Sequence, residues 1–169
     1  MLWTKSNRAD REVVPMADRH YNRQKVGAPQ FAPPGRCLVL KRPDAFWITS
    51  YPFAQYVKHR WAGAWVCSAF RNEGGRLSSA LILDAVAATR WYYGEPPPEG
   101  MVSFVDETKV RPKQTPGYCF IRAGFVFDGR TEGGLLAFVM KPHSVPFERA
   151  PIGATERHKS YLGPNTLAV

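Results

Sequence analysis

The 169-residue chain has little cysteine and no long apolar run, and each shortage excludes a class of protein. Its three cysteines, Cys37, Cys67 and Cys119, are an odd number, and no two of them have the close spacing of a zinc ribbon. We therefore expect reduced thiols, a cytoplasmic location and neither a disulfide framework nor a metal site. No apolar stretch approaches the roughly 18 residues that a membrane span needs, so we expect no membrane partner.

The sequence also has no apolar segment near its start, where residues 4–11 are polar and charged, so we expect no secretory signal. Its length fits one domain, and 44% hydrophobic residues are enough for a core. We interpret residues 1–10 as a flexible leader, 11–142 as one domain, and 143–169 as a C-terminal tail that is mobile or docks on the domain. The oligomeric state is left open.

The chain is rich in positive charge. Its 23 Lys and Arg residues against 14 Asp and Glu residues give a net charge of +9, which favours a polyanionic partner such as nucleic acid. We expect either nucleic-acid contacts or solvated loops at two basic groups: Lys58, His59 and Arg60, and Lys109, Arg111 and Lys113.

Hydrophobic periodicity predicts an α/β fold with a mixed sheet. One strand–loop–helix–strand crossover in the middle of the chain implies one parallel strand pair among antiparallel ones. The expected helices cover residues 13–24, 77–91 and 116–123. The expected strands cover residues 37–41, 45–49, 64–70, 101–105, 125–127 and 135–140.

The most informative segment runs from Phe70 to Ser79, where an apolar strand leads through Gly74 and Gly75 into a helix. Free backbone N–H groups at a helix start attract anions, and glycines admit a phosphate closely and tolerate positive φ. The segment lacks the Gly-Lys-Ser/Thr ending of a Walker A loop and the GxGxxG spacing of a Rossmann fingerprint. The alternative is an ordinary turn whose glycines serve packing.

The order of these elements resembles the GNAT superfamily of acyl-CoA N-acyltransferases. In that family a central strand feeds an Arg/Gln-x-x-Gly-x-Gly/Ala loop, here residues 71–76, and the next strand, here 101–105, splays away. A short helix then ends in an aromatic-x-x-x-Gly-Phe pattern, here Phe120 to Phe125. The resemblance spans roughly residues 36–141. It implies a mixed, mainly antiparallel sheet with a splayed central strand pair and flanking helices.

The resemblance also implies acetyl-CoA or another acyl-CoA as the acyl donor, and an amine as the acceptor. The strand end and loop would hold the donor, with contacts at Cys67, Ser68, Ala69, Arg71, Asn72, Glu73, Gly74, Gly75, Arg76, Leu77 and Ser78. One position departs from the family: Phe120 stands where a tyrosine often acts as the general acid. Tyr118 and Cys119 are its neighbours, and they substitute for it only if the helix is rotated.

A narrower resemblance is to the Mom-like branch of bacteriophage DNA-modification proteins, itself GNAT-like. It rests on His20-Tyr21, on Arg76 with Ser78-Ser79, and on Ser103 to Asp106. That branch modifies adenine in DNA, which implies duplex DNA as the acceptor and, for a phage protein, the host cytoplasm.

Our candidate catalytic residues are Asp106, Tyr118 and Ser79. Asp106 would orient the acceptor amine or receive its proton, or else it simply ends the strand. Ser78 and Ser79 would either bond phosphate or cap the helix. A non-enzymatic, basic nucleic-acid-binding module is a further reading of the charge.

Overall fold

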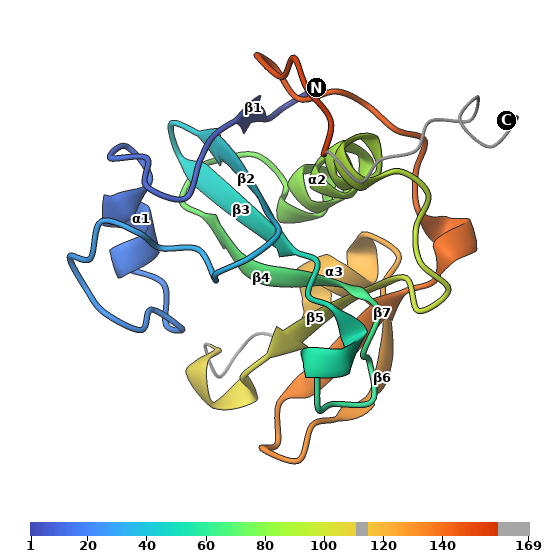
Figure 1. The fold of residues 1–169 in the computed structure, drawn as a ribbon. Coiled ribbons are helices and arrows are strands. Elements are labelled where there is room, and N and C mark those ends of the chain that lie inside the picture. Colours follow the sequence, from blue (N-terminus) through green and yellow to red (C-terminus); the bar gives the residue numbers. More distant parts are fainter. Residues whose placement is uncertain (111–114, 159–169) are drawn as a thin grey trace, which may run out of the picture.

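The computed structural model of the chain describes residues 1–110 and 115–158, and within them seven strands form one sheet in the order β1-β2-β3-β4-β5-β7-β6 (Figure 1). Neighbouring strands are antiparallel except β4 and β5, which confirms the predicted mixed sheet and its one parallel step. The strands are β1 (Thr4–Lys5), β2 (Cys37–Arg42), β3 (Ala45–Ser50), β4 (Trp65–Asn72), β5 (Met101–Val105), β6 (Val126–Arg130) and β7 (Leu136–Met140).

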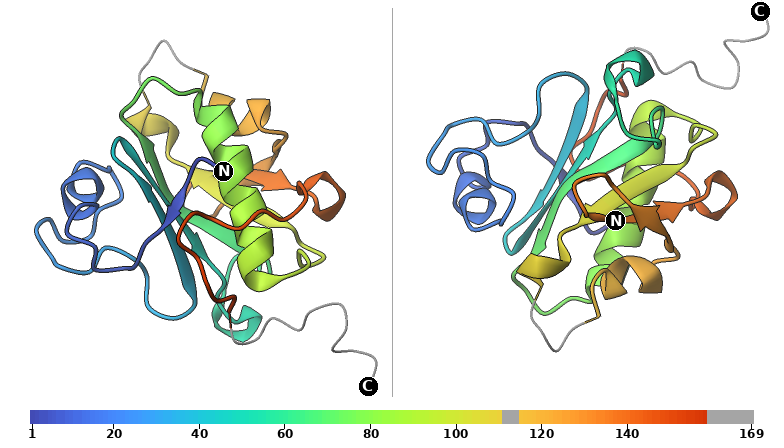
Figure 2. Two further views of the ribbon diagram at one scale, coloured as in Figure 1. Left: turned by 90° about the horizontal axis from the view of Figure 1, so that it is seen from above. Right: turned by 90° about the horizontal axis from the view of Figure 1, so that it is seen from below.

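Helices cover both faces of this sheet, and Figure 2 shows α1 and α2 on opposite sides of it. The helices are α1 (Val14–Asp18), α2 (Ser78–Tyr93) and α3 (Tyr118–Arg122), with short 3-10 turns η1 (Ala54–Tyr56), η2 (Glu107–Lys109) and η3 (Pro142–Ser144). Their positions agree with the predicted helices except at α1. No helix in the described part of the chain is long and apolar enough to cross a bilayer.

Alternating side chains of β2 and β3 are buried on opposite faces of the sheet. Leu38, Leu40 and Trp47 are buried against the face that α2 and α3 cover. Val39 and Ile48, their neighbours in sequence, are buried against the α1 face instead. This period-two pattern is what a strand buried on both faces requires.

The expectation of a flexible leader over residues 1–10 is wrong. Trp3 is fully buried, and its indole N–H donates to the Leu81 carbonyl of α2 at 2.9 Å. β1 pairs with β2, and the segment around Ile152 docks on it, because the Ile152 N–H donates to the Trp3 carbonyl at 2.9 Å. A single buried indole therefore anchors a segment whose other residues are mostly polar.

The predicted helix over residues 13–24 is also too long. α1 ends at Asp18, where the Asp18 carboxylate accepts hydrogen bonds from the Arg23 guanidinium at 2.9 Å and from the Gly27 N–H at 3.0 Å. These bonds fold the chain back, so that the next residues lie along β4 instead of continuing the helix.

Candidate functional site

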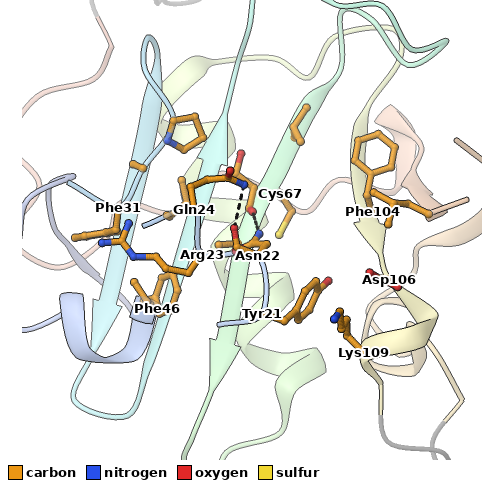
Figure 3. Close-up of a pocket in the computed structure, with 18 of the residues that line it drawn as sticks. Tyr21, Asn22, Arg23, Gln24, Phe31, Phe46, Cys67, Phe104, Asp106 and Lys109 are labelled. Atoms are coloured by element: carbon orange, nitrogen blue, oxygen red, sulfur yellow. Dashed lines mark hydrogen bonds between the residues drawn. The ribbon is translucent and has the colours of Figure 1, made fainter. Parts of the chain in front are cut away.

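The central feature of the sheet is an opening between β4 and β5. The two strands pair only through Trp65, Val66 and Cys67, opposite residues 101–103. Beyond Cys67 the strands diverge, and Figure 3 shows side chains from both walls of the opening. A parallel pair that separates in this way leaves strand edge exposed inside the molecule.

A β-bulge in β4 lies where the strands separate. Ile48 of β3 pairs with Ala69 and Thr49 pairs with Cys67, so no residue of β3 lies opposite Ser68 in the register, although the Ser68 hydroxyl bonds to that of Ser50. The bulge changes which side chains face which core: Cys67 packs on the α2 side, whereas Ala69, two residues later, packs on the α1 side. Bulges commonly bend a strand beside a functional site.

Two cavities meet at this opening. One, of about 590 Å³, lies on the α1 side and includes Phe31, Phe46 and Asp106 in its wall (Figure 3). The other, of about 610 Å³, extends between Ser78 at the start of α2 and Tyr118 in α3. The two cavities share Tyr21, Asn22, Cys67, Ser68, Ala69 and Phe104 as wall residues.

The segment after α1 crosses the edge of β4. The Asn22 side-chain amide donates to the Ser68 carbonyl at 2.8 Å, and His20 Nε2 lies 3.1 Å from the Phe70 carbonyl. His20 Nδ1 accepts from the Asn22 N–H at 3.2 Å, so Nε2 carries the proton and both ring nitrogens are occupied. Burial lowers the pKa of His20 and favours the neutral ring, which therefore positions β4 and is not a free base.

Tyr21 lies between the two walls of the opening, stacked on His20 with ring centroids 4.7 Å apart (Figure 3). Partial burial raises the pKa of Tyr21, whose hydroxyl also bonds with the backbone of Asp106. The phenol is therefore protonated at neutral pH, and half of the side chain remains exposed to an incoming ligand.

Asp106 follows β5 and lines the 590 Å³ cavity, as expected for a candidate catalytic residue. Its Oδ1 also accepts from the Thr108 N–H at 3.0 Å and the Thr108 hydroxyl at 2.6 Å, so it caps the turn after the strand as well. These bonds lower the pKa of Asp106, which makes the carboxylate a weak base. It is better suited to orient an amine than to take its proton.

The loop between β4 and α2 is held by its own side chains. The Asn72 amide donates to the Arg76 carbonyl at 2.8 Å and to the Ser78 hydroxyl at 3.0 Å, and its oxygen accepts from the Gly74 N–H at 3.0 Å. Glu73 binds the guanidinium groups of Arg19 and Arg71, both at 2.6 Å, and these bonds lower its pKa to about 2.

Gly74 and Gly75 of this loop differ in the space that a side chain would meet. Neither has positive φ, so the conformational freedom expected of them is not used. A Cβ on Gly74 would lie 1.9 Å from an Asp44 carboxylate oxygen, whereas a Cβ on Gly75 would meet open space. Gly74 thus serves packing against Asp44, and Gly75 leaves the front of the loop clear.

The structure gathers only some of the predicted site residues. Cys67, Ser68, Ala69, Asn72, Ser78 and Tyr118 line the 610 Å³ cavity, and Asp106 and Lys109 line the other. Ser79, the second residue of α2, lines neither cavity, so its catalytic assignment finds no support. The remaining predicted residues line neither cavity: Arg71 lies in β4, and Glu73, Gly74, Gly75, Arg76 and Leu77 form the loop between β4 and α2.

The structure describes the whole of the first predicted basic group, residues 58–60, but only Lys109 of the second. Arg60 stacks over Trp61, 4.6 Å from its ring centroid, and lies 3.7 Å from the Asp128 carboxylate. His59 contacts the Phe104 ring at 5.0 Å, and Lys58 is exposed. Arg111 and Lys113 lie outside the described residues.

The thiols of the site are unreactive. Burial raises the pKa of Cys67 and of Cys119, so both are protonated at neutral pH. The described residues also contain no group of three or more His, Cys, Asp or Glu side chains that could hold a metal ion.

Sequence reasoning missed the residues that the N-terminal third contributes to the 590 Å³ cavity. Asn22, Gln24, Gln30 and Phe31 come from a segment expected to be helix or plain loop. No local motif marks them, because their role arises from the chain folding back after Asp18.

No protein-family model, curated protein or solved structure matches this chain.

Proposed function

We propose that the chain is an acyl-CoA-dependent N-acyltransferase of the GNAT type, using acetyl-CoA or another acyl-CoA. The observation that carries the proposal is the pair of cavities that meet at the β4–β5 opening beside the start of α2. A reaction between two substrates needs such a meeting point, because the attacking and attacked atoms must approach to about 3 Å.

The 610 Å³ cavity suits the acyl donor. At its end near Ser78, α2 has 16 residues, no side-chain cap and no acidic residue in its first turn, so its N–H groups remain available to an anion. Arg76 is exposed there and forms no ion pair among the described residues. A pyrophosphate would add charge-assisted bonds to this loop, and the open space in front of Gly75 would admit it.

The stretch of β4 beyond Cys67, which β5 leaves unpaired, would hold the amide-bearing arm of the donor, and the arm would replace the Asn22 and His20 side chains on the Ser68 and Phe70 carbonyls. The bulge at Ser68 would place backbone N–H groups near the thioester carbonyl, where they would stabilise the oxyanion of the transition state. In the reaction the acceptor nitrogen bonds to the carbonyl carbon, the C–S bond breaks, and the proton lost by the amine ends on the departing thiolate.

Side chains on the two sides of the opening would have separate roles. Asp106, with its lowered pKa, would accept a hydrogen bond from the amine and orient it. Tyr118, exposed on the wall of the donor cavity, is the hydroxyl available to protonate the thiolate, since Phe120 is buried and has no proton to give.

A specific observation favours a second candidate, a Mom-like enzyme that acts on adenine in DNA. The 590 Å³ cavity combines the amides of Asn22, Gln24 and Gln30 with the rings of Phe31 and Phe104. Amide side chains pair with the edge of adenine, and aromatic rings stack on bases. The net charge of +9 fits a polyanionic acceptor.

Calorimetry with the full chain and acetyl-CoA tests the first proposal. Gly75→Val should weaken binding at least about tenfold, because the new side chain would occupy the space in front of the loop. Gly133→Val is the matched control: that glycine also lacks positive φ, and a Cβ there meets one atom, 3.8 Å away. Absence of binding by the wild-type chain, or equal binding by both variants, would contradict the proposal.

A filter-binding titration with duplex DNA separates the two candidates. The Mom-like reading expects affinity that falls with salt, with a slope of about −0.9 per phosphate contact. Acetyl-CoA binding without DNA retention at low salt would leave an acyltransferase with a small-molecule or protein acceptor.

A further inference from the structure

A second surface of the molecule lies on the segment that connects β3 to β4, around the η1 turn, and it belongs to neither cavity. Phe53 and Tyr56 stand on it with 58% and 75% of their surface exposed, their ring centroids 6.4 Å apart in an edge-to-face arrangement. Scattered single apolar side chains are ordinary on a protein surface, but a pair of adjoining, exposed aromatic rings forms a platform.

Arg36 holds this platform in place. Its guanidinium carbon lies 4.4 Å from the centroid of Tyr51 and 4.3 Å from that of Phe53. Arg36 Nε is buried and has no hydrogen-bond partner. The stacked guanidinium restricts the Phe53 ring from one side. The ring therefore loses little conformational entropy when a ligand binds to its other side.

The platform carries positive charge that nothing nearby in the sequence offsets. No acidic residue occurs between Asp44 and Glu73, while Lys58 follows Tyr56 by two positions. Lys58 is exposed and forms no ion pair within residues 1–110 and 115–158. Arg60, in contrast, is already engaged with Asp128.

Exposed rings with a lysine nearby in the sequence that forms no ion pair among the described residues fit one class of partner. We propose that this aromatic platform, defined as Arg36, Phe53, Tyr56 and Lys58, binds single-stranded nucleic acid. Unpaired bases stack on the rings of Phe53 and Tyr56, and Lys58 contacts the phosphates. A duplex is the poorer partner, because its base faces are stacked on one another and only its phosphates would meet the surface.

The platform would act independently of the acyl-transfer site. None of its four residues lines either of the two cavities. The proposal thus goes beyond the proposed function and stands whether or not the chain binds acyl-CoA.

Fluorescence anisotropy with a labelled oligothymidylate and the full chain tests this proposal. Phe53→Ala and Tyr56→Ala should each weaken binding by about fivefold or more, as expected for losing one stacked base. The dependence on salt should stay the same, because the rings are uncharged. Lys58→Gln should instead make the salt slope shallower by about 0.7, the value for one phosphate contact on a single strand.

Phe147→Ala is the matched control, because Phe147 is 88% exposed but lies far along the chain, after η3. It should bind like the wild type. Affinity for the oligothymidylate that is no higher than for a duplex of the same length would overturn the proposal. So would ring variants that bind like the wild type. Calorimetry on the same variants measures acetyl-CoA affinity at the proposed donor site, and this affinity should equal that of the wild type.

Discussion

Trp3→Ala is the substitution that most directly tests how the first residues support the candidate site. Trp3 is fully buried in the core between the sheet and α2, and it bonds to Leu81, one turn from the start of that helix. The expected result is a large loss of stability and, through α2, a less ordered loop at the proposed donor site.

The magnitude follows from what the substitution removes. Replacing a buried Trp or Phe with Ala costs about 3–5 kcal/mol through lost burial and the cavity left behind. The hydrogen bond to the Leu81 carbonyl adds about 1 kcal/mol at most, because that carbonyl lies within α2 and keeps a helical partner. We therefore expect about 4 kcal/mol, a large part of the roughly 5–15 kcal/mol that stabilises a typical domain.

Urea denaturation followed by circular dichroism measures this loss. With a denaturant dependence of about 2 kcal/mol per molar, the unfolding midpoint should fall by about 2 M. Phe147→Ala serves as the control and should shift it by less than about 0.3 M, because that ring is almost fully exposed. A midpoint for Trp3→Ala within that same small range would refute the buried position of the N-terminal strand.

Three further predictions concern the site. Asp106→Asn should lower acyl-transfer turnover about 10²-fold or more and leave acetyl-CoA affinity unchanged; full turnover in steady-state kinetics would return Asp106 to a purely capping role. Glu73 has a pKa of about 2 in the folded chain against 4.5 ordinarily, so its contribution to stability is present above about pH 4.5 and is lost as the pH falls toward 2. The difference in urea midpoint between wild type and Glu73→Gln should therefore shrink as the pH is lowered from 7 to 2.5. A difference independent of pH would contradict a stabilising role for the ion pairs of Glu73 with Arg19 and Arg71. Iodoacetamide should label Cys67 slowly at pH 7 until urea unfolds the chain, since burial keeps the thiol protonated; rapid labelling of the folded protein, located by mass spectrometry, would show a reactive thiol.

Much of the fold follows from local patterns. The apolar strands, the long helix after the glycine pair and the parallel step all have signals within a few residues of where they form. Local patterns fail near Trp3, because a single tryptophan among polar residues gives no periodicity, and only tertiary packing makes it an anchor.

The site was less accessible to sequence reasoning than the fold. Asp106 could be placed because it follows the predicted strand 101–105, and Cys67 and Ser68 because they lie within the predicted strand 64–70. Asn22 could not, because its bond to the Ser68 carbonyl joins segments 46 residues apart and depends on how the chain turns after α1. The bulge at Ser68 likewise has no local sequence signal, because a bulge is defined by how β4 pairs with β3.

The proposed function requires that an acyl donor binds along the stretch of β4 that β5 leaves unpaired and at the start of α2. A ¹⁵N–¹H NMR titration of the full chain with acetyl-CoA tests this most directly, because it reports on each backbone amide separately. We predict that the amides of Ser68, Ala69, Phe70, Ser78 and Ser79 shift together with one saturable affinity. Shifts confined to other parts of the chain, or no shifts at millimolar acetyl-CoA, would contradict the claim.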